Sequence, residues 1–147
     1  MKDISEILTI GLPFCVFKIV TGLHLVSVSN PFTGGALVAL GVLDTGLNLG
    51  NLLTFFFGKP RILPVCCLTG LTAWILRKKP HAREKRMDLG NSIDMAVALV
   101  LVAGMVGFGR IGALPPDHIL VWNVAVVLNV LGAGLSRLNS SFRQLNT

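Results

Sequence analysis

Three ionisable residues, Lys18, Asp44 and Asp94, lie within stretches of sequence that are otherwise apolar. On insertion scales a charged side chain costs about 2.5–3.5 kcal/mol at the centre of a bilayer, so such residues normally face the interior of a helical bundle. An ammonium and a carboxylate that meet there form either a structural ion pair or a relay for protons or ions. These residues are therefore the first candidates for chemistry in this chain.

Lys18 shares one face of its predicted helix with small residues. They recur at i, i+4, i+7 and i+11 and are Gly11, Cys15, Lys18 and Gly22. Small residues let two helices approach closely, so this stripe predicts a packing face and not a face toward lipid.

The segment that carries Asp44 has two patterned faces. Asp44, Asn48 and Asn51 repeat at i, i+4 and i+7, whereas Gly46 and Gly50 form a GxxxG pattern on the opposite side. One face can make polar contacts and the other a close helix crossing. The pattern predicts that this segment is central, with protein on both sides.

Depth within the two helices predicts a partner for Lys18. Counted from the outer helix ends, Lys18 lies about eight residues in and Asp44 about seven, which is roughly 11–12 Å at helical rise. The two residues are level in an antiparallel hairpin, so we expect a Lys18–Asp44 ion pair. Its role is either a proton or ion relay or a clamp between the two helices, and the use of buried ion pairs as registry devices favours the clamp.

The remaining polar residues have simpler interpretations. Asp94 follows Asn91 by three residues and is expected near a helix start, where the helix dipole stabilises a carboxylate. Asn129 belongs to a small and polar stripe that is expected to face the bundle and to hydrogen-bond another helix; its other members are Ala125, Gly132 and Ser136.

Composition places these residues in a membrane protein. Of the 147 residues 52% are hydrophobic and only 14% are charged, against about a quarter charged in soluble domains; the mean hydropathy is +0.73. The sequence predicts an all-α, polytopic membrane bundle in one domain, residues 1–147. Its expected helices cover residues 7–28, 36–57, 62–76, 89–108 and 118–135.

A basic run between apolar segments sets the expected orientation. It occupies the loop 77–88, and its basic residues are Arg77, Lys78, Lys79, Arg83, Lys85 and Arg86. Such clusters remain on the cytoplasmic side of a bilayer, and this one can also contact anionic lipid headgroups. We therefore expect a bacterial inner-membrane protein whose loop 77–88 and C-terminus are cytoplasmic.

The short segment 62–76 decides the number of crossings. Its length fits a re-entrant or interfacial piece better than a complete crossing. With four crossings, every basic residue except Lys18 and Arg110 lies inside, whereas a fifth crossing would move Lys2, Lys59 and Arg61 outside. The positive-inside rule favours four crossings, and a thin bilayer would still accept five.

Two aromatic residues and two histidines are expected near the membrane surfaces. Trp74 and Trp122 are candidate interfacial anchors. His24 and His118 approach the outer surface near Asp117, where a metal or proton site is conceivable but an ordinary interfacial position is the simpler interpretation.

The sequence carries no catalytic or cofactor motif. Walker, GxGxxG, HExxH, CxxC and GxSxG patterns are all missing, and the cysteines have no metal-ligand spacing. We therefore expect neither an enzyme, a bound cofactor, a metal nor a nucleic-acid partner. The first hypothesis is a structural, assembly or accessory subunit of a membrane complex, in contact with lipids and with copies of itself or other subunits. The alternative is a small oligomeric transporter or channel that uses the Lys/Asp/Asn cluster.

Overall fold

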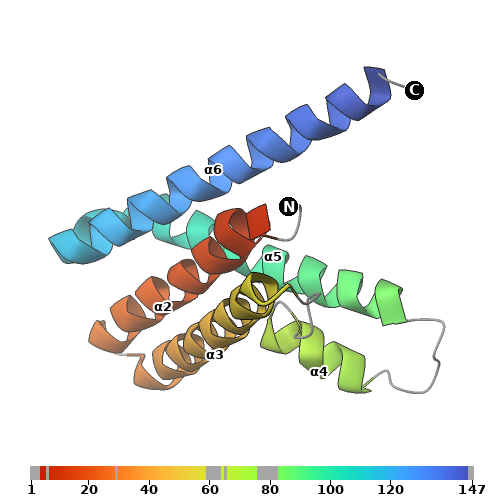
Figure 1. Cartoon of the computed structure of the whole chain (residues 1–147). Coiled ribbons are helices and arrows are strands. Elements are labelled where there is room, and N and C mark those ends of the chain that lie inside the picture. The colour runs from red at the N-terminus through yellow and green to blue at the C-terminus, as the bar shows by residue number, and fades with distance from the viewer. Residues whose placement is uncertain are drawn as a thin grey trace.

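A computed structural model describes residues 4–5, 7–28, 30–58, 64, 66–75 and 83–145, and only the backbone for 72–75, 83–89, 91 and 136–145. Over these ranges every regular element is helical, in agreement with the predicted all-α class (Figure 1). The elements in chain order are the π-helix η1 (Ile7–Gly11), α2 (Leu12–Ser27), α3 (Pro31–Phe56), α4 (Cys67–Ile75), α5 (Arg83–Gly107), the short 3-10 helix η3 (Arg110–Ala113) and α6 (Pro116–Leu145).

Three segments are long and apolar enough to cross a membrane: Ile7–Ser27, Pro31–Phe56 and Pro116–Leu135. The apolar part of α5, Ser92–Gly107, is shorter. The helix α4 has nine residues, about 14 Å of helical rise against the roughly 30 Å of hydrocarbon in a bilayer. The predicted membrane class therefore holds with three candidate crossings.

The helix α3 begins at Pro31, five residues before the predicted start at residue 36. Residues 31–35, which the prediction leaves in a loop between two helices, are therefore helical. Two local features start the helix early. The side chain of Asn30 accepts a hydrogen bond from the Thr33 N–H at 3.3 Å, and Pro31 occupies the first turn, where its missing N–H is harmless. A very short connection therefore holds α2 and α3 as a hairpin.

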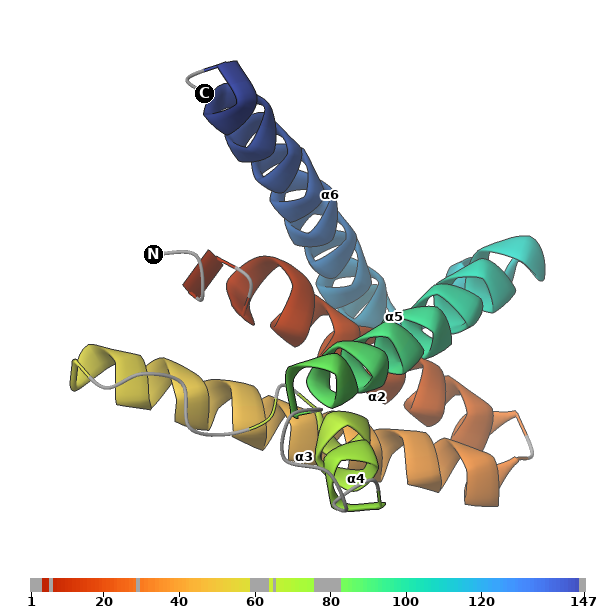
Figure 2. The same cartoon turned by 90° about the vertical axis from the view of Figure 1, so that its right-hand side faces the viewer.

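Two further boundaries differ from the prediction. Part of the expected basic loop 77–88 is helical, because α5 already begins at Arg83, and Arg, Glu, Lys and Met are good helix formers. The helix α6 begins at Pro116 and continues past residue 135 to Leu145. Its C-terminal half diverges from the other helices (Figure 2).

The α2–α3 hairpin is packed through glycine. A Cβ atom placed on Gly22 would lie 2.7 Å from the Gly34 carbonyl oxygen, and one on Gly41 would lie 3.0 Å from the Cys15 carbonyl oxygen. The backbones of the two helices thus approach as closely as the small-residue stripe on α2 predicts. All four members of that stripe are buried.

An apolar core fills the space between α2, α5 and α6. Its buried members are Phe14, Phe17, Val20, Ala98, Met105, Leu114, Trp122 and Ala125. Trp122 is 1% exposed, and its ring centroid lies 4.9 Å from that of Phe17. The expectation that Trp122 is an interfacial anchor is therefore wrong, because α6 turns this side chain toward α2. The side chain of Trp74 lies outside the described side chains.

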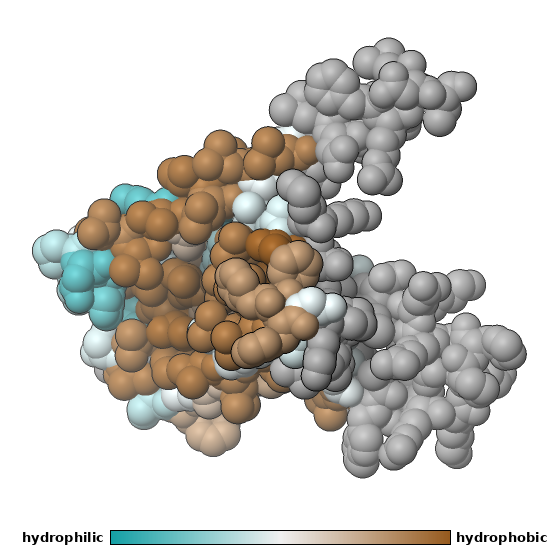
Figure 3. Space-filling view, in the orientation of Figure 1, coloured by the Kyte–Doolittle hydropathy of each residue, from teal (hydrophilic) through white to brown (hydrophobic). Residues whose placement is uncertain are grey.

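The expectation that α3 is central is also wrong within the described chain. Its polar face is buried, but the opposite face is exposed and carries Val42, Leu49, Leu53 and Phe56. No described atom lies within 4 Å of a Cβ placed on Gly46. Brown, hydrophobic side chains cover most of the described surface in Figure 3, and hydrophilic ones gather at one end. This distribution suits a molecule surrounded by lipid.

Candidate functional site

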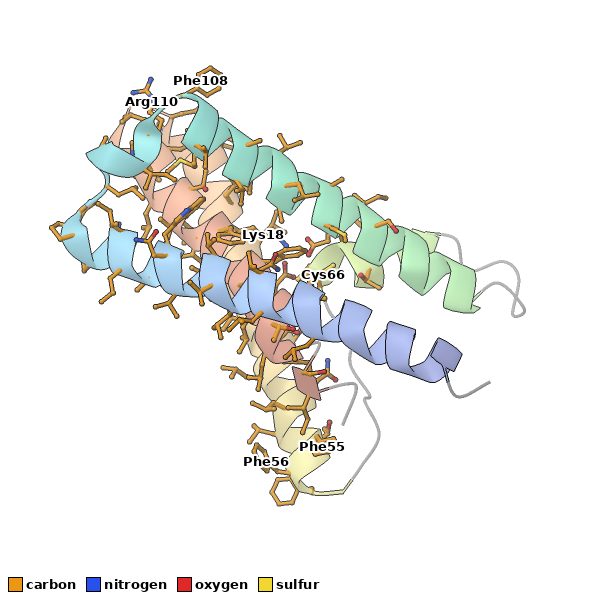
Figure 4. The ribbon with its side chains drawn as sticks, turned by 90° about the horizontal axis from the view of Figure 1, so that it is seen from above. Lys18, Phe55, Phe56, Cys66, Phe108 and Arg110 are labelled. Carbon is orange, nitrogen blue, oxygen red and sulfur yellow. The ribbon has the colours of Figure 1, made fainter. Side chains whose placement is uncertain are left out.

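Lys18 lies in the interior of the bundle, between two carboxylates. Its side chain projects from α2 and is only 2% exposed. Nζ donates one hydrogen bond to Asp44 Oδ2 on α3 at 2.6 Å and a second to Asp94 Oδ1 on α5. Figure 4 shows Lys18 near the middle of the molecule, whereas Phe56 and Phe108 mark the periphery. The ion pair predicted from depth is present, and a second carboxylate joins it.

Asp44 uses both carboxylate oxygens. Oδ2 accepts from Lys18, and Oδ1 accepts from the backbone N–H of Cys67 at 2.6 Å. Cys67 is the first residue of α4, so Asp44 supplies the hydrogen-bond acceptor that a helix N-terminus needs. The positive end of the α4 dipole also favours a negative charge at this point. Asp44 therefore binds α2 and α4 to α3.

Asp94 differs from the prediction. The sequence predicts that Asp94 lies near a helix start, but α5 begins at Arg83, about three turns earlier. Asp94 is 7% exposed, compared with 1% for Asp44. Asp94 therefore lies well inside α5 and not at its start, and its side chain meets Lys18 in the bundle.

The cluster borders a cavity of about 180 Å³. Its polar lining comes from Cys15, Asp44, Asn48, Cys66, Ser92 and Asp94, and its apolar lining includes Ile10, Phe14 and Met95. Ser92 and Met95 are exposed, so the cavity reaches the surface beside α5. Both aspartates of the cluster therefore have access to a space large enough for several water molecules.

The π-helix η1 forms one wall of this cavity. It contributes Ile10 and Gly11. A Cβ atom on Gly11 would lie 2.5 Å from Asn48 Oδ1, so any larger residue at this position would require the Asn48 amide to move. Single π-helical turns occur frequently at functional sites because the extra residue changes the direction of nearby side chains. The local geometry therefore agrees with a binding site beside Lys18.

The structure divides the predicted polar residues into three groups. Asn48 joins the Lys18 cluster: its Nδ2 donates to the Asp44 carbonyl oxygen at 2.9 Å and contacts Cys15 Sγ at 3.7 Å. Asn51 Nδ2 instead donates to the Pro64 carbonyl oxygen at 3.4 Å. Asn129 Nδ2 donates to the Thr9 carbonyl oxygen at 3.2 Å and so ties α6 to η1. Neither Asn51 nor Asn129 is among the residues that line the cavity.

The predicted lipid-contact residues fall at the edge of what is described. Arg77, Lys78 and Lys79 lie outside the described residues, and Arg83, Lys85 and Arg86 belong to the start of α5, where only the backbone is described. Their proposed contact with headgroups therefore stays a prediction.

The conceivable histidine and aspartate metal site is not formed. His24 is 7% exposed and lies inside the bundle, whereas His118 Nε2 is 3.9 Å from Asp117 Oδ2 near the surface. Over the described part of the chain, no group of three His, Cys, Asp or Glu residues is placed to hold a metal ion.

Sequence reasoning missed two contributors to the site. The backbone N–H of Cys67 has no side-chain signal, because any residue at the start of α4 could supply it. The pattern predicts Gly11 only as part of a packing stripe, although its place four residues before Cys15 and seven before Lys18 puts it on the same face.

Comparison with known proteins adds no relative: the chain matches no protein-family model, no curated protein and no solved structure. The function is therefore inferred from the geometry of the site.

Proposed function

We propose that this protein is a small membrane transport protein that carries protons across the bilayer through the cluster of Lys18, Asp44 and Asp94. The proposal rests on one observation, a buried lysine hydrogen-bonded to two carboxylates at the edge of a cavity.

The charges of the cluster support a proton site. One ammonium and two ionised carboxylates carry a net charge of −1 in an interior where unpaired charge is costly. The addition of one proton to a carboxylate makes the cluster neutral. Two states that differ by one proton are what a proton carrier requires. In the described part of the chain, three thiols also lie near the cluster: those of Cys15 and Cys66 in the cavity wall and that of Cys67 beside Asp44.

Asp94 is the better candidate for the exchanging carboxyl. Asp44 is held by Lys18 and by the N-terminus of α4, whereas Asp94 contacts Lys18 through Oδ1. Asp94 is also the more exposed of the two, and it lines the cavity beside exposed Ser92. A proton from water in the cavity can therefore reach Asp94 without breaking the contacts of Asp44.

The orientation is part of the proposal. With four crossings, which include the apolar part of α5, the basic run 77–86 and the C-terminus lie in the cytoplasm of a bacterial cell. The basic side chains of that run would contact anionic lipid headgroups. The cavity then opens toward the cytoplasmic half, because it adjoins the N-terminal part of α2 and the first apolar turns of α5.

The test is proton flux into vesicles that contain the purified full-length chain and a pH-sensitive dye, driven by a potassium diffusion potential. The internal pH of vesicles that contain the wild type should change faster than that of empty vesicles, and Asp94→Asn should abolish this difference in rate. Asp117→Asn is the matched control, because the side chain of Asp117 is 79% exposed and lies at the start of α6. Wild-type flux equal to that of empty vesicles, or full flux in Asp94→Asn, would contradict the proposal.

A second candidate function is an accessory or assembly subunit of a membrane complex. It is supported by the exposed faces of α3 and α6. Of the apolar stretches of these two helices that could cross a membrane, only 22% and 17% are buried within the structure. Together with Gly46, these faces offer room for further helices of another subunit or of a second copy. Purification from native membranes in mild detergent should then yield a partner in fixed stoichiometry.

A further inference from the structure

We infer that Thr21 and His24 hold water molecules that extend the proton path from the Lys18 cluster to the opposite end of the bundle. This inference rests on the proposed function, to which it adds the second half of the route. It is carried by two buried polar side chains on α2 that the cluster does not use.

Both side chains are buried, and each has a polar atom without a protein partner. Thr21 is 5% exposed and His24 is 7% exposed. Within the described part of the chain, Thr21 Oγ1 and His24 Nε2 make no hydrogen bond. A buried polar atom left without a partner costs about 1–3 kcal/mol, and such atoms are normally satisfied by protein or by ordered water.

The Thr21 hydroxyl differs from those of Thr9 and Thr45. Thr9 donates to the Ser5 carbonyl oxygen at 2.6 Å, and Thr45 donates to the Gly41 carbonyl oxygen at 2.7 Å. This bond to the preceding turn is the common arrangement for threonine in helices. Thr21 does not make it, so its hydroxyl is available to a water molecule.

The side chains of Lys18, Thr21 and His24 occupy neighbouring positions along α2. Lys18, Thr21 and His24 are three residues apart, which gives about 4.5 Å of rise per step and neighbouring positions on the helix surface. No direct hydrogen bond joins Thr21 Oγ1 or His24 Nε2 to a neighbouring described group. A bridging water joins two polar atoms about 5 Å apart, because two hydrogen bonds in series cover that distance.

The two polar residues and the cavity lie on opposite sides of Lys18 along α2. The cavity adjoins Ile10 to Cys15, whereas Thr21 and His24 follow Lys18 toward the C-terminus of the helix. A proton that enters through the cavity therefore reaches the cluster from one side and can leave it on the other.

His24 leads to the end of the bundle where α6 begins. The Asn129–Thr9 hydrogen bond and the Trp122–Phe17 contact set an antiparallel register between α2 and α6, which places His24 level with the start of α6. The α2–α3 and α5–α6 connections lie at this same end in Figure 1, and hydrophilic side chains gather there in Figure 3. The path thus ends at a polar surface.

The transfer itself balances. The proton that leaves Asp94 passes to the first water, which releases one of its own protons to the next group in line. Each water ends with the protons it had at the start, and one proton emerges beyond His24.

The first test is proton flux in vesicles with the full-length chain. Thr21→Val removes the hydroxyl at nearly constant volume and should lower flux about tenfold, the effect of a barrier raised by about 1.4 kcal/mol, whereas Thr21→Ser should retain flux. Thr45→Val is the matched control, because the Thr45 hydroxyl is already bonded within its helix. Unchanged flux in Thr21→Val would overturn the inference while leaving the role of Asp94 intact.

The second test measures water directly and does not need transport. Brief X-ray radiolysis generates hydroxyl radicals from water, and mass spectrometry locates the oxidised residues. His24 should be oxidised, and Thr21→Val should reduce this labelling, whereas Trp122 in the apolar core should be protected although indole is the more reactive ring. Equal protection of His24 and Trp122 would overturn the path. Labelled His24 in a protein without proton flux would support the hydrated chain and reject the transport function.

Discussion

Lys18 and Asp94 are 76 positions apart in the chain, yet Lys18 Nζ donates a hydrogen bond to Asp94 Oδ1 inside the bundle. The same ammonium binds Asp44, whose other oxygen accepts the first N–H of α4. One lysine therefore connects α2 with α3 and α5 directly and with α4 through Asp44. The site that we propose for proton transfer is also a junction of four helices, so changes in charge should affect stability as well as flux.

Replacement of Lys18 alone should strongly destabilise the protein. Lys18→Met leaves two carboxylates without their shared cation, and loss of one partner of a buried ion pair costs about 3–5 kcal/mol. The neutral triple variant Lys18→Met, Asp44→Asn, Asp94→Asn should recover most of this loss, because no buried charge remains. Denaturant titration in detergent micelles, followed by far-UV circular dichroism, measures both. A triple variant as unstable as Lys18→Met would show that packing of the lysine, and not its charge, holds the junction.

Gly22 should not tolerate a methyl group. In Gly22→Ala the new Cβ would lie 2.7 Å from the Gly34 carbonyl oxygen and 2.8 Å from Val38 Cγ2, so the hairpin must separate at a cost of about 1–3 kcal/mol. Gly46→Ala lies on the same hairpin with no described atom within 4 Å and should change stability by about 0.5 kcal/mol or less in the monomer. Thermal unfolding of the two variants in one detergent gives the comparison. If Gly46→Ala is the more damaging change, the Gly46 face is covered by another helix in the assembled protein.

Trp122 should behave as a core residue. With Trp74→Phe in the background, the remaining indole should emit at short wavelength and resist quenching by acrylamide, because Trp122 is 1% exposed. Trp122→Ala should cost about 3–5 kcal/mol through the cavity left beside Phe17. Emission and quenching typical of a water-exposed indole would instead restore the interfacial position that the sequence suggested.

Labelling of single cysteines should decide the number of crossings. In a background with Cys15, Cys66 and Cys67 changed to alanine, cysteines at positions 59 and 83 should react with an impermeant maleimide from the same, cytoplasmic side. Phe108 is 80% exposed and lies at the far end of α5. A cysteine introduced there, Phe108→Cys, should therefore react only from the other side. Reaction of positions 59 and 83 from opposite sides would establish a fifth crossing through residues 62–76.

Much of the architecture could be predicted from local pattern. The helical class, the small-residue face of α2 and the inward direction of Asn129 each follow from a periodicity within one helix. The Lys18–Asp44 pair was also within reach, because a short hairpin forces two helices to be antiparallel and so relates their depths directly. Predictions of this kind need only one helix or two adjacent ones.

The remaining features depend on where distant helices cross. Nothing in the surroundings of Asp94 in the sequence relates its depth to that of Lys18, because the intervening chain has no constant geometry; only the packing of α5 on α2 brings them together. The burial of Trp122 and the exposure of the glycine face of α3 were mispredicted for the same reason. Periodicity determines which side chains share a face of a helix, but the partner of that face is chosen by the packing of the whole bundle.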